Sequence, residues 1–372
     1  MNPPMKTYII PIYFLLFLMN ASAQKNHFNL LIGTYTHSCE SNGIYVYDFN
    51  SDTAEVTLKS STQKVINPSY LSVSEKGDVV YSVNENGPKS TISAFKFDGK
   101  KLALVNQKDS EGADPCHIIN DENNILTANY SGGSISIFGK KKDGSLTNVK
   151  QVIKHSGNSA SRQRQEGPHV HMVQFSPDKK FVLATDLGTD RIYIYNYNPK
   201  STKEVLIFKD TVPIKTGSGP RHLTFHPNGK FIYLLQELDG SVTVFNYLNG
   251  KTRLIQEVSL LSQNQLGSIG AAAVRISADG KFLYATNRGD ANTISVFEIV
   301  VTGKLQHVET ISSGGQSPRD FNFDPTGKFL LVAHEKSNEI VIYERSSVTG
   351  KLKNTGNRIQ LCAPVNIEFV MK

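Results

Sequence analysis

The segment IYIYNY, residues 192–197, is one of seven short aromatic strands that recur along the chain. The other copies begin at Ile44, Ile92, Ser134, Val242, Ile294 and Ile340. The core of the pattern, which starts at Ile135 in the third copy, returns every 43 to 57 residues. A repeat of this length, in which apolar and polar residues alternate, is typical of small antiparallel sheets arranged radially. The sequence therefore predicts an all-β protein, a seven-bladed β-propeller.

A second series of seven strands, such as PRHLTFHP at residues 220–227, precedes the aromatic strand in each repeat. At the chain ends the two series are out of phase. NLLIGTY from Asn29 and the first aromatic strand have no earlier partner, and VNIEFV from Val365 has no later one. Pairing them closes the ring and removes exposed sheet edges. We therefore predict a closing blade shared by the N-terminal and C-terminal strands, and one domain over residues 24–372.

The first 23 residues differ from the repeats. Lys6 precedes an apolar stretch from Tyr8 to Met19, and Ala21-Ser22-Ala23 supplies the small residues of a secretory cleavage site. We predict a signal peptide over residues 1–23 and a periplasmic or secreted mature chain, with no stable membrane association after cleavage. An uncleaved membrane anchor is the alternative. We expect the mature protein to be a monomer.

The net charge of +7 comes largely from lysines in turns spread around the ring, such as Lys76, Lys179 and Lys230. Because the sequence shows no basic helix and no RNA-binding motif, we expect a solvated surface and no nucleic-acid partner.

Three cysteines in an exported protein allow at most one internal disulfide. Cys39 follows the second strand of the closing blade, and Cys362 lies just before the first strand of the same blade. We therefore predict a Cys39–Cys362 disulfide with Cys116 free; three reduced thiols are the alternative.

One face of the ring collects the candidate functional residues. In an antiparallel blade the start of the first strand lies beside the end of the second, so both positions share a face. Strand starts supply His117, His169, His171, Arg221, His222, Arg319 and Asp320. Strand ends supply Asn84, Glu85, Asn129, Asp186, Glu237, Asn287, Arg288, His334 and Glu335. Arginine binds carboxylate or phosphate through two parallel hydrogen bonds, so this cluster indicates an anionic substrate. A channel whose polar residues bind only water is the alternative.

An insertion from His155 to Pro168 enters the same face. Its residues Arg162, Arg164 and Glu166 form either a rim over the channel mouth or a solvated loop.

Five strings resemble the propeller-type lactonase family, which includes bacterial 6-phosphogluconolactonase and the carboxymuconate lactonizing enzyme. They are GPHVHMVQFSPD, DLGTDRIYIY, GPRHLTFHPNGKFIYLLQEL, ATNRGDANTISVF and SPRDFNFDPTGKFLLVAHE. The resemblance covers the chain after Gln24. It implies an active site at the channel mouth that uses no metal or other cofactor, with catalytic positions at His171, Arg221, Glu237 and Arg288. The expected substrate contacts are His169, His222, Arg164, Asp186 and Arg319. Because the chain carries an export signal, its lactone is expected to differ from the phosphogluconolactone made in the cytoplasm.

Ring opening needs an activated water and positive charge beside the developing oxyanion. We predict that Glu237 is the base, acting directly or through His171. Arg221 and Arg288 then stabilise the oxyanion or bind an anionic substrate group. The predicted activity is metal-independent hydrolysis of a sugar-derived or other anionic lactone.

Other functions remain open. The same residues could run the reaction backwards, as in a muconate-type lactonizing enzyme, or the face could bind a ligand or protein without catalysis. A calcium-dependent lactonase would use an axial cluster such as Asn84, Asn129 and Asp186. A serine hydrolase is disfavoured because the sequence has no G-x-S-x-G motif.

Overall fold

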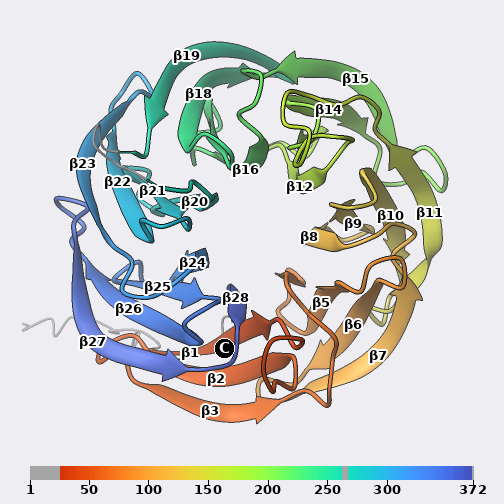
Figure 1. Ribbon diagram of the computed structural model, residues 1–372. Helices are drawn as coiled ribbons and strands as arrows, with labels where there is room; N and C mark the ends of the chain where they lie inside the picture. Colours follow the sequence, from red (N-terminus) through yellow and green to blue (C-terminus); the bar gives the residue numbers. More distant parts are fainter. Residues whose placement is uncertain (1–25, 262–266, 371–372) are drawn as a thin grey trace, which may run out of the picture.

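The computed structural model describes residues 26–261 and 267–370. In this part the chain forms seven four-stranded antiparallel sheets arranged around a central axis (Figure 1). This arrangement confirms the predicted seven-bladed β-propeller. The predicted signal peptide, residues 1–23, lies outside the described residues. No helix within residues 26–261 and 267–370 is long and apolar enough to cross a membrane.

Each sheet contributes one strand to each of four concentric rings. The innermost strands are β4 (Leu71–Val73), β8 (Pro115–Asn120), β12 (Val170–Phe175), β16 (Pro220–Phe225), β20 (Ala271–Ile276), β24 (Pro318–Phe323) and β28 (Pro364–Val370). The second strands are β1 (His27–Thr34), β5 (Val79–Asn84), β9 (Asn124–Asn129), β13 (Phe181–Asp186), β17 (Phe231–Gln236), β21 (Phe282–Asn287) and β25 (Phe329–His334). The third strands, which are the aromatic series, are β2 (Ile44–Asn50), β6 (Thr91–Phe97), β10 (Ser134–Lys140), β14 (Arg191–Tyr197), β18 (Ser241–Leu248), β22 (Thr293–Ile299) and β26 (Glu339–Arg345). The outermost strands are β3 (Val56–Ser61), β7 (Leu102–Asp109), β11 (Leu146–Lys154), β15 (Leu206–Pro213), β19 (Lys251–Ser259), β23 (Leu305–Ser312) and β27 (Leu352–Gln360).

The closing blade is built as the sequence predicted. Strand β28 pairs with β1, with Leu31 opposite Glu368, and β2 and β3 complete the sheet. Cys39 and Cys362 form a disulfide in this blade, across a sequence separation of 323 residues, while Cys116 is free and buried. The ring is therefore closed by backbone hydrogen bonds and by one covalent link, and the predicted disulfide is confirmed.

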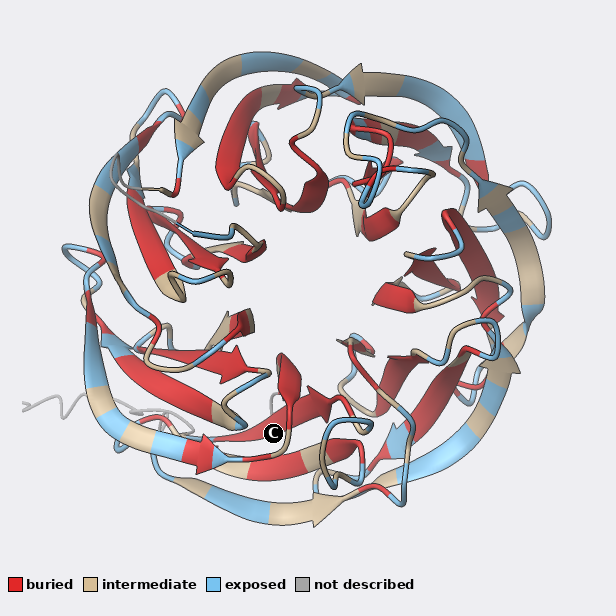
Figure 2. Cartoon of the chain, viewed as in Figure 1, coloured by how far each residue is buried: buried red, intermediate tan, exposed pale blue. Residues whose placement is uncertain are grey.

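The core lies between neighbouring blades, whose sheets pack face to face. Leu126 and Ala128 of β9, for example, share one buried cluster with Val182 and Ala184 of β13. The second strands from β5 to β25 are buried along their whole length, whereas the outermost strands alternate between partly buried and exposed residues (Figure 2). Apolar burial of this kind is the main stabilising term in folding, so the packing of the blades keeps the innermost strands in a fixed ring.

A repeated tyrosine contact fixes the spacing between blades. The Tyr233 hydroxyl of β17 donates to the Gly303 carbonyl of the next blade at 2.9 Å, and Tyr81 and Tyr284 make the equivalent contact. Gly303 has a φ of +80°, and a Cβ there would lie 2.3 Å from the Phe231 ring. Only glycine combines that backbone conformation with so close an approach. The turn that carries Gly303 can therefore pack directly against β17 of the preceding blade.

A β-bulge interrupts the start of most innermost strands. In β16, Pro220 pairs with Gln236 and His222 pairs with Leu235, so Arg221 is the extra residue. The same break leaves Cys116, His171, Arg319 and Val365 unpaired in their own strands. Bulges re-aim side chains. These five, which we call the bulge residues, all line one narrow gap at the axis.

The residues that follow four of the bulge residues line a second space. His117, Met172, His222 and Asp320 line a wider cavity of about 420 Å³ inside the central channel. His222 and Asp320 also line the narrow gap, whereas His117 and Met172 line only the wider cavity. The bulges therefore turn Cys116 and His171 away from the wider cavity.

Candidate active site

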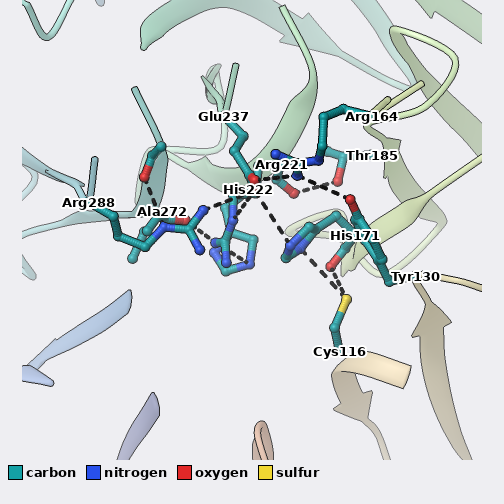
Figure 3. Close-up of polar contacts among 12 residues, drawn as sticks. Cys116, Tyr130, Arg164, His171, Thr185, Arg221, His222, Glu237, Ala272 and Arg288 are labelled. Carbon is teal, nitrogen blue, oxygen red and sulfur yellow. Dashed lines mark hydrogen bonds and ion pairs between the residues drawn. The ribbon is translucent and has the colours of Figure 1, made fainter. Parts of the chain in front are cut away.

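Glu237 is the centre of the polar cluster at the mouth. It directly follows β17, and its carboxylate contacts three guanidinium groups (Figure 3). The Oε2 atom lies 2.8 Å from Arg221 Nε and 3.2 Å from Arg288 Nη2, and Oε1 lies 2.7 Å from Arg164 Nη2. The structure therefore brings together Glu237, Arg221 and Arg288, which the sequence placed at one mouth, and adds Arg164 from the insertion.

The arginines decide the charge of Glu237. Burial alone would raise its pKa, but the nearby Arg288, Arg221 and Arg164 guanidinium groups outweigh burial and hold the pKa well below its usual range. An opposite charge at this range stabilises the ionised carboxylate. Glu237 is consequently an anion at any pH at which the protein would work.

The Arg221 guanidinium is held by neighbouring protein groups. Besides Glu237, its Nη1 donates to the Ala272 carbonyl and lies 3.2 Å from His222 Nε2. Its side chain is only 2% exposed, and burial together with Arg288 lowers its pKa to about 10, which leaves it charged at neutral pH. Its position suits a group that fixes Glu237 rather than one that meets substrate.

Arg288 and Arg164 are more accessible, with side chains 17% and 44% exposed. Arg288 Nε donates to the Gly270 carbonyl at 2.9 Å, which leaves other N–H groups of its guanidinium toward the mouth. Arg164 comes from the insertion and also donates to the Tyr130 hydroxyl at 3.2 Å. Of the two interpretations of the insertion, the structure therefore shows the rim, because one of its residues caps Glu237.

His171 lies beside the same carboxylate. Its Nε2 is 3.9 Å from Glu237 Oε2, too long for a direct hydrogen bond, but both atoms can hydrogen-bond one shared water. Burial, reinforced by the Arg221 charge, lowers the pKa of His171 well below its usual value, so the imidazole is neutral. The pair thus offers two acceptors to a water at the mouth.

Cys116 lies near His171, with Sγ 3.7 Å from Nδ1, which raises the question of a thiol nucleophile. Burial raises the pKa of this thiol, and Sγ donates to the His171 carbonyl at 3.3 Å. A protonated, buried thiol is a poor nucleophile. The geometry therefore favours water over Cys116 as the attacking group.

Asp186 does not join this cluster. Its carboxylate is fully buried and lies 2.7 Å from His155 Nδ1, and it accepts the backbone N–H groups of His169 and Gly188 at 2.9 and 3.0 Å. These contacts hold the ends of the insertion. We therefore place Asp186 in the support of the loop rather than in substrate contact.

The other predicted contacts take different places. His169 stacks on Tyr130, with ring centroids 4.6 Å apart, and lies 3.1 Å from Glu166 on the rim. His222 accepts from the Arg221 guanidinium and lines both the narrow gap and the channel cavity. Arg319 lines the same gap as His171 and Arg221.

Asn84 and Asn129, which were candidates for a calcium site, form hydrogen bonds within their own blades. Asn84 donates to the Ile66 carbonyl, and Asn129 donates to the Ser134 and Ser136 hydroxyls.

Sequence reasoning missed two supporting residues. Tyr130 stands one position beyond the end of β9 and contacts both Arg164 and His169. Its position at a strand end could have identified it as a residue of this mouth. His155 gave no such signal, because it begins the insertion and meets Asp186 only through the fold.

The chain is similar to several known proteins. Residues 29–369 match the family model described as Lactonase, 7-bladed beta-propeller. A 6-phosphogluconolactonase of Bacillus subtilis is 33% identical over 346 residues, which is 91% of this chain and 97% of that protein. A solved structure from Bacteroides fragilis is 40% identical with a TM-score of 0.90, covering 94% of this chain and 99% of its own. The periplasmic gluconolactonase of Pseudomonas aeruginosa is 35% identical with a TM-score of 0.89, covering 93% and 99%. The chain therefore belongs to the seven-bladed β-propeller lactonase family.

Proposed function

We propose that this protein hydrolyses a sugar-derived lactone at the mouth of its propeller, as its relatives named 6-phosphogluconolactonase and gluconolactonase suggest. The observation that carries the proposal is the buried Glu237 carboxylate, held by Arg221, Arg288 and Arg164 and placed 3.9 Å from His171. A fixed anion, a neutral imidazole and accessible guanidinium groups are the parts that water attack on an ester needs.

In the proposed reaction, a water bound by Glu237 and His171 attacks the lactone carbonyl carbon. Its proton passes to one of these two acceptors while the carbonyl oxygen becomes an oxyanion. The ring C–O bond then breaks, and the former ring oxygen takes up a proton and leaves as a hydroxyl. The products are a hydroxy acid, ionised at neutral pH, and one released proton.

Arg288 is the best-placed oxyanion donor, because it is accessible and keeps N–H groups that Glu237 and Gly270 do not use. When Arg288 turns toward the oxyanion, Glu237 loses part of the positive charge that depresses its pKa. The carboxylate therefore becomes a stronger base at the step that needs one. Arg221 stays in place and keeps Glu237 aligned.

We also propose that the mature chain, residues 24–372, acts as a single-domain monomer in the periplasm. The support is the Lys6, apolar and Ala21-Ser22-Ala23 pattern in the sequence, together with a relative that is described as periplasmic.

A screen of sugar lactones, phosphorylated and not, tests the proposed function by acid release in a pH-stat. We expect release well above the spontaneous rate, with no change on adding EDTA, because protein side chains supply every group in the proposed reaction. Release that falls to the spontaneous rate with EDTA would favour a metal-dependent lactonase. No release from any lactone would favour a binding propeller.

A further inference from the structure

A second pocket opens at the same mouth, beside the candidate active site. It has a volume of about 460 Å³, within the range of about 300–1,000 Å³ that is common for small-molecule sites. The residues that give it its chemistry are Tyr35, Glu85, Arg319 and Glu335. Arg319 belongs both to this pocket and to the narrow gap lined by His171 and Arg221. The pocket therefore adjoins the reacting groups.

Arg319 is an arginine of this mouth that does not contact Glu237. Arg164, Arg221 and Arg288 all contact Glu237, whereas Arg319 makes no hydrogen bond or ion pair within residues 26–261 and 267–370. Its guanidinium lies over the Tyr35 ring, 5.1 Å from the centroid. Guanidinium N–H groups with no acceptor are available to a ligand oxygen.

Two carboxylates in the pocket are only partly used. Glu85 accepts hydrogen bonds from Ser69 and from the Tyr35 hydroxyl through Oε1, and Glu335 meets Ser317 through Oε2 at 3.4 Å. The other oxygen of each carboxylate has no hydrogen bond in the described part of the chain. Asp114 adds a third carboxylate to the lining.

These groups select for a ligand that both donates and accepts hydrogen bonds. A sugar hydroxyl can accept from Arg319 and donate to Glu85 or Glu335. A phosphate or carboxylate can only accept, and it would face the Glu335 and Asp114 carboxylates with Arg319 as the one guanidinium of the lining. Like charges at close range disfavour binding.

We propose that this pocket is a hydroxyl-binding subsite that selects an uncharged polyhydroxylated lactone over its phosphorylated form. The inference rests on the proposed lactonase function for the identity of the reacting group. It proposes an uncharged substrate where the sequence predicted an anionic one, because Arg164, Arg221 and Arg288 contact Glu237.

Kinetics with two substrates test the subsite: glucono-1,5-lactone and its 6-phosphate. For the wild-type chain we expect kcat/KM to be at least about tenfold higher for the uncharged lactone, a difference of about 1.4 kcal/mol. Glu335→Gln should narrow this ratio by about tenfold, mainly through KM, since it removes one repulsive charge and weakens one hydroxyl contact. Glu75→Gln, the same substitution in a turn on the opposite face, should leave the ratio unchanged. A wild-type preference for the phosphorylated lactone, or a ratio unaffected by Glu335→Gln, overturns the inference.

A binding measurement separates the subsite from catalysis. Titration calorimetry of the wild-type chain with D-glucitol and with D-glucitol 6-phosphate needs no turnover. Tighter binding of the uncharged polyol, weakened by Glu335→Gln and not by Glu75→Gln, supports the subsite even if no lactone is hydrolysed, an outcome that would overturn the proposed function alone. Equal or tighter binding of the phosphate ester overturns the subsite, whatever the activity.

Discussion

Arg221 donates through Nε to Glu237 Oε2 at 2.8 Å, and both side chains are nearly inaccessible to solvent. A buried pair of this kind is costly to break, because removing one partner leaves an unpaired charge in the interior. Arg288 shares the same oxygen but is more exposed. The two arginines should therefore respond differently to the same substitution.

Arg221→Lys should lower stability, whereas Arg288→Lys should lower catalysis. Lysine cannot reproduce the contacts of Arg221 with Glu237, Ala272 and His222, so we expect a loss of about 3 kcal/mol in the free energy of unfolding. In Arg288→Lys we expect an almost unchanged melting temperature and a kcat about 100-fold lower, as for a lost oxyanion donor. Thermal melts and steady-state kinetics on the two variants check this, and a reversal of the two patterns would contradict the assigned roles.

Arg164→Gln should shift the pH profile more than the rate. Arg164 is one of the cations that keep the pKa of Glu237 low, so without it this pKa rises. Protonation of the carboxylate, which lies below the working pH range in the wild type, should then move up toward that range and shift the acid limb of the activity to higher pH. The loss in kcat/KM at neutral pH should stay below about tenfold, because a half-exposed ion pair is worth about 1 kcal/mol or less. An acid limb that does not move would show that Glu237 does not titrate in the activity profile.

Glu368→Gln should stabilise the protein at alkaline but not at acid pH. Burial raises the pKa of Glu368 from 4.5 to about 7, although Arg275 opposes the shift. The fold therefore prefers the protonated form, and its contribution to stability, complete below pH 4.5, is lost as the pH rises to about 7. The glutamine variant should gain about 1–3 kcal/mol at pH 8 and little at pH 4. Equal effects at both pH values would contradict the shifted titration.

Loss of the disulfide should lower stability without abolishing activity. The Cys39–Cys362 link closes most of the chain into one loop, and disulfides typically contribute about 2–4 kcal/mol. A Cys39→Ser/Cys362→Ser double variant should therefore melt at a lower temperature while its kcat stays close to that of the wild type. Cys116→Ala, which leaves the disulfide intact, is the control. A double variant as stable as the wild type would show that the β28–β1 pairing alone closes the ring.

The sequence was sufficient to predict the blade count, the shared closing blade and the disulfide, because periodic strands and their phase depend on local patterns. It also placed Glu237, Arg221, Arg288 and His171 at one mouth, since antiparallel topology brings strand starts beside strand ends. It could not separate His171, which lines the narrow gap, from His117, which lines the wider cavity. That separation follows from bulges at the strand starts, and a bulge depends on pairing with the neighbouring strand.

The sequence alone could not predict what the arginines bind. Three guanidinium groups could hold substrate or hold Glu237, and only their distances show that they hold Glu237. Asp186 was placed correctly at a strand end, but its partner His155 lies 31 positions away in the insertion. Its supporting role therefore required the folded chain.

The most direct test of the account compares the wild type with Glu237→Gln by acid release from glucono-1,5-lactone in a pH-stat. Glutamine keeps the shape of the side chain and removes the base, so kcat should fall by at least about 100-fold. Asn228→Ala, in a turn on the opposite face, should retain wild-type turnover, and circular dichroism should confirm that both variants fold. A Glu237→Gln variant that is folded and hydrolyses the lactone at the wild-type rate would contradict the assignment of this mouth as the active site.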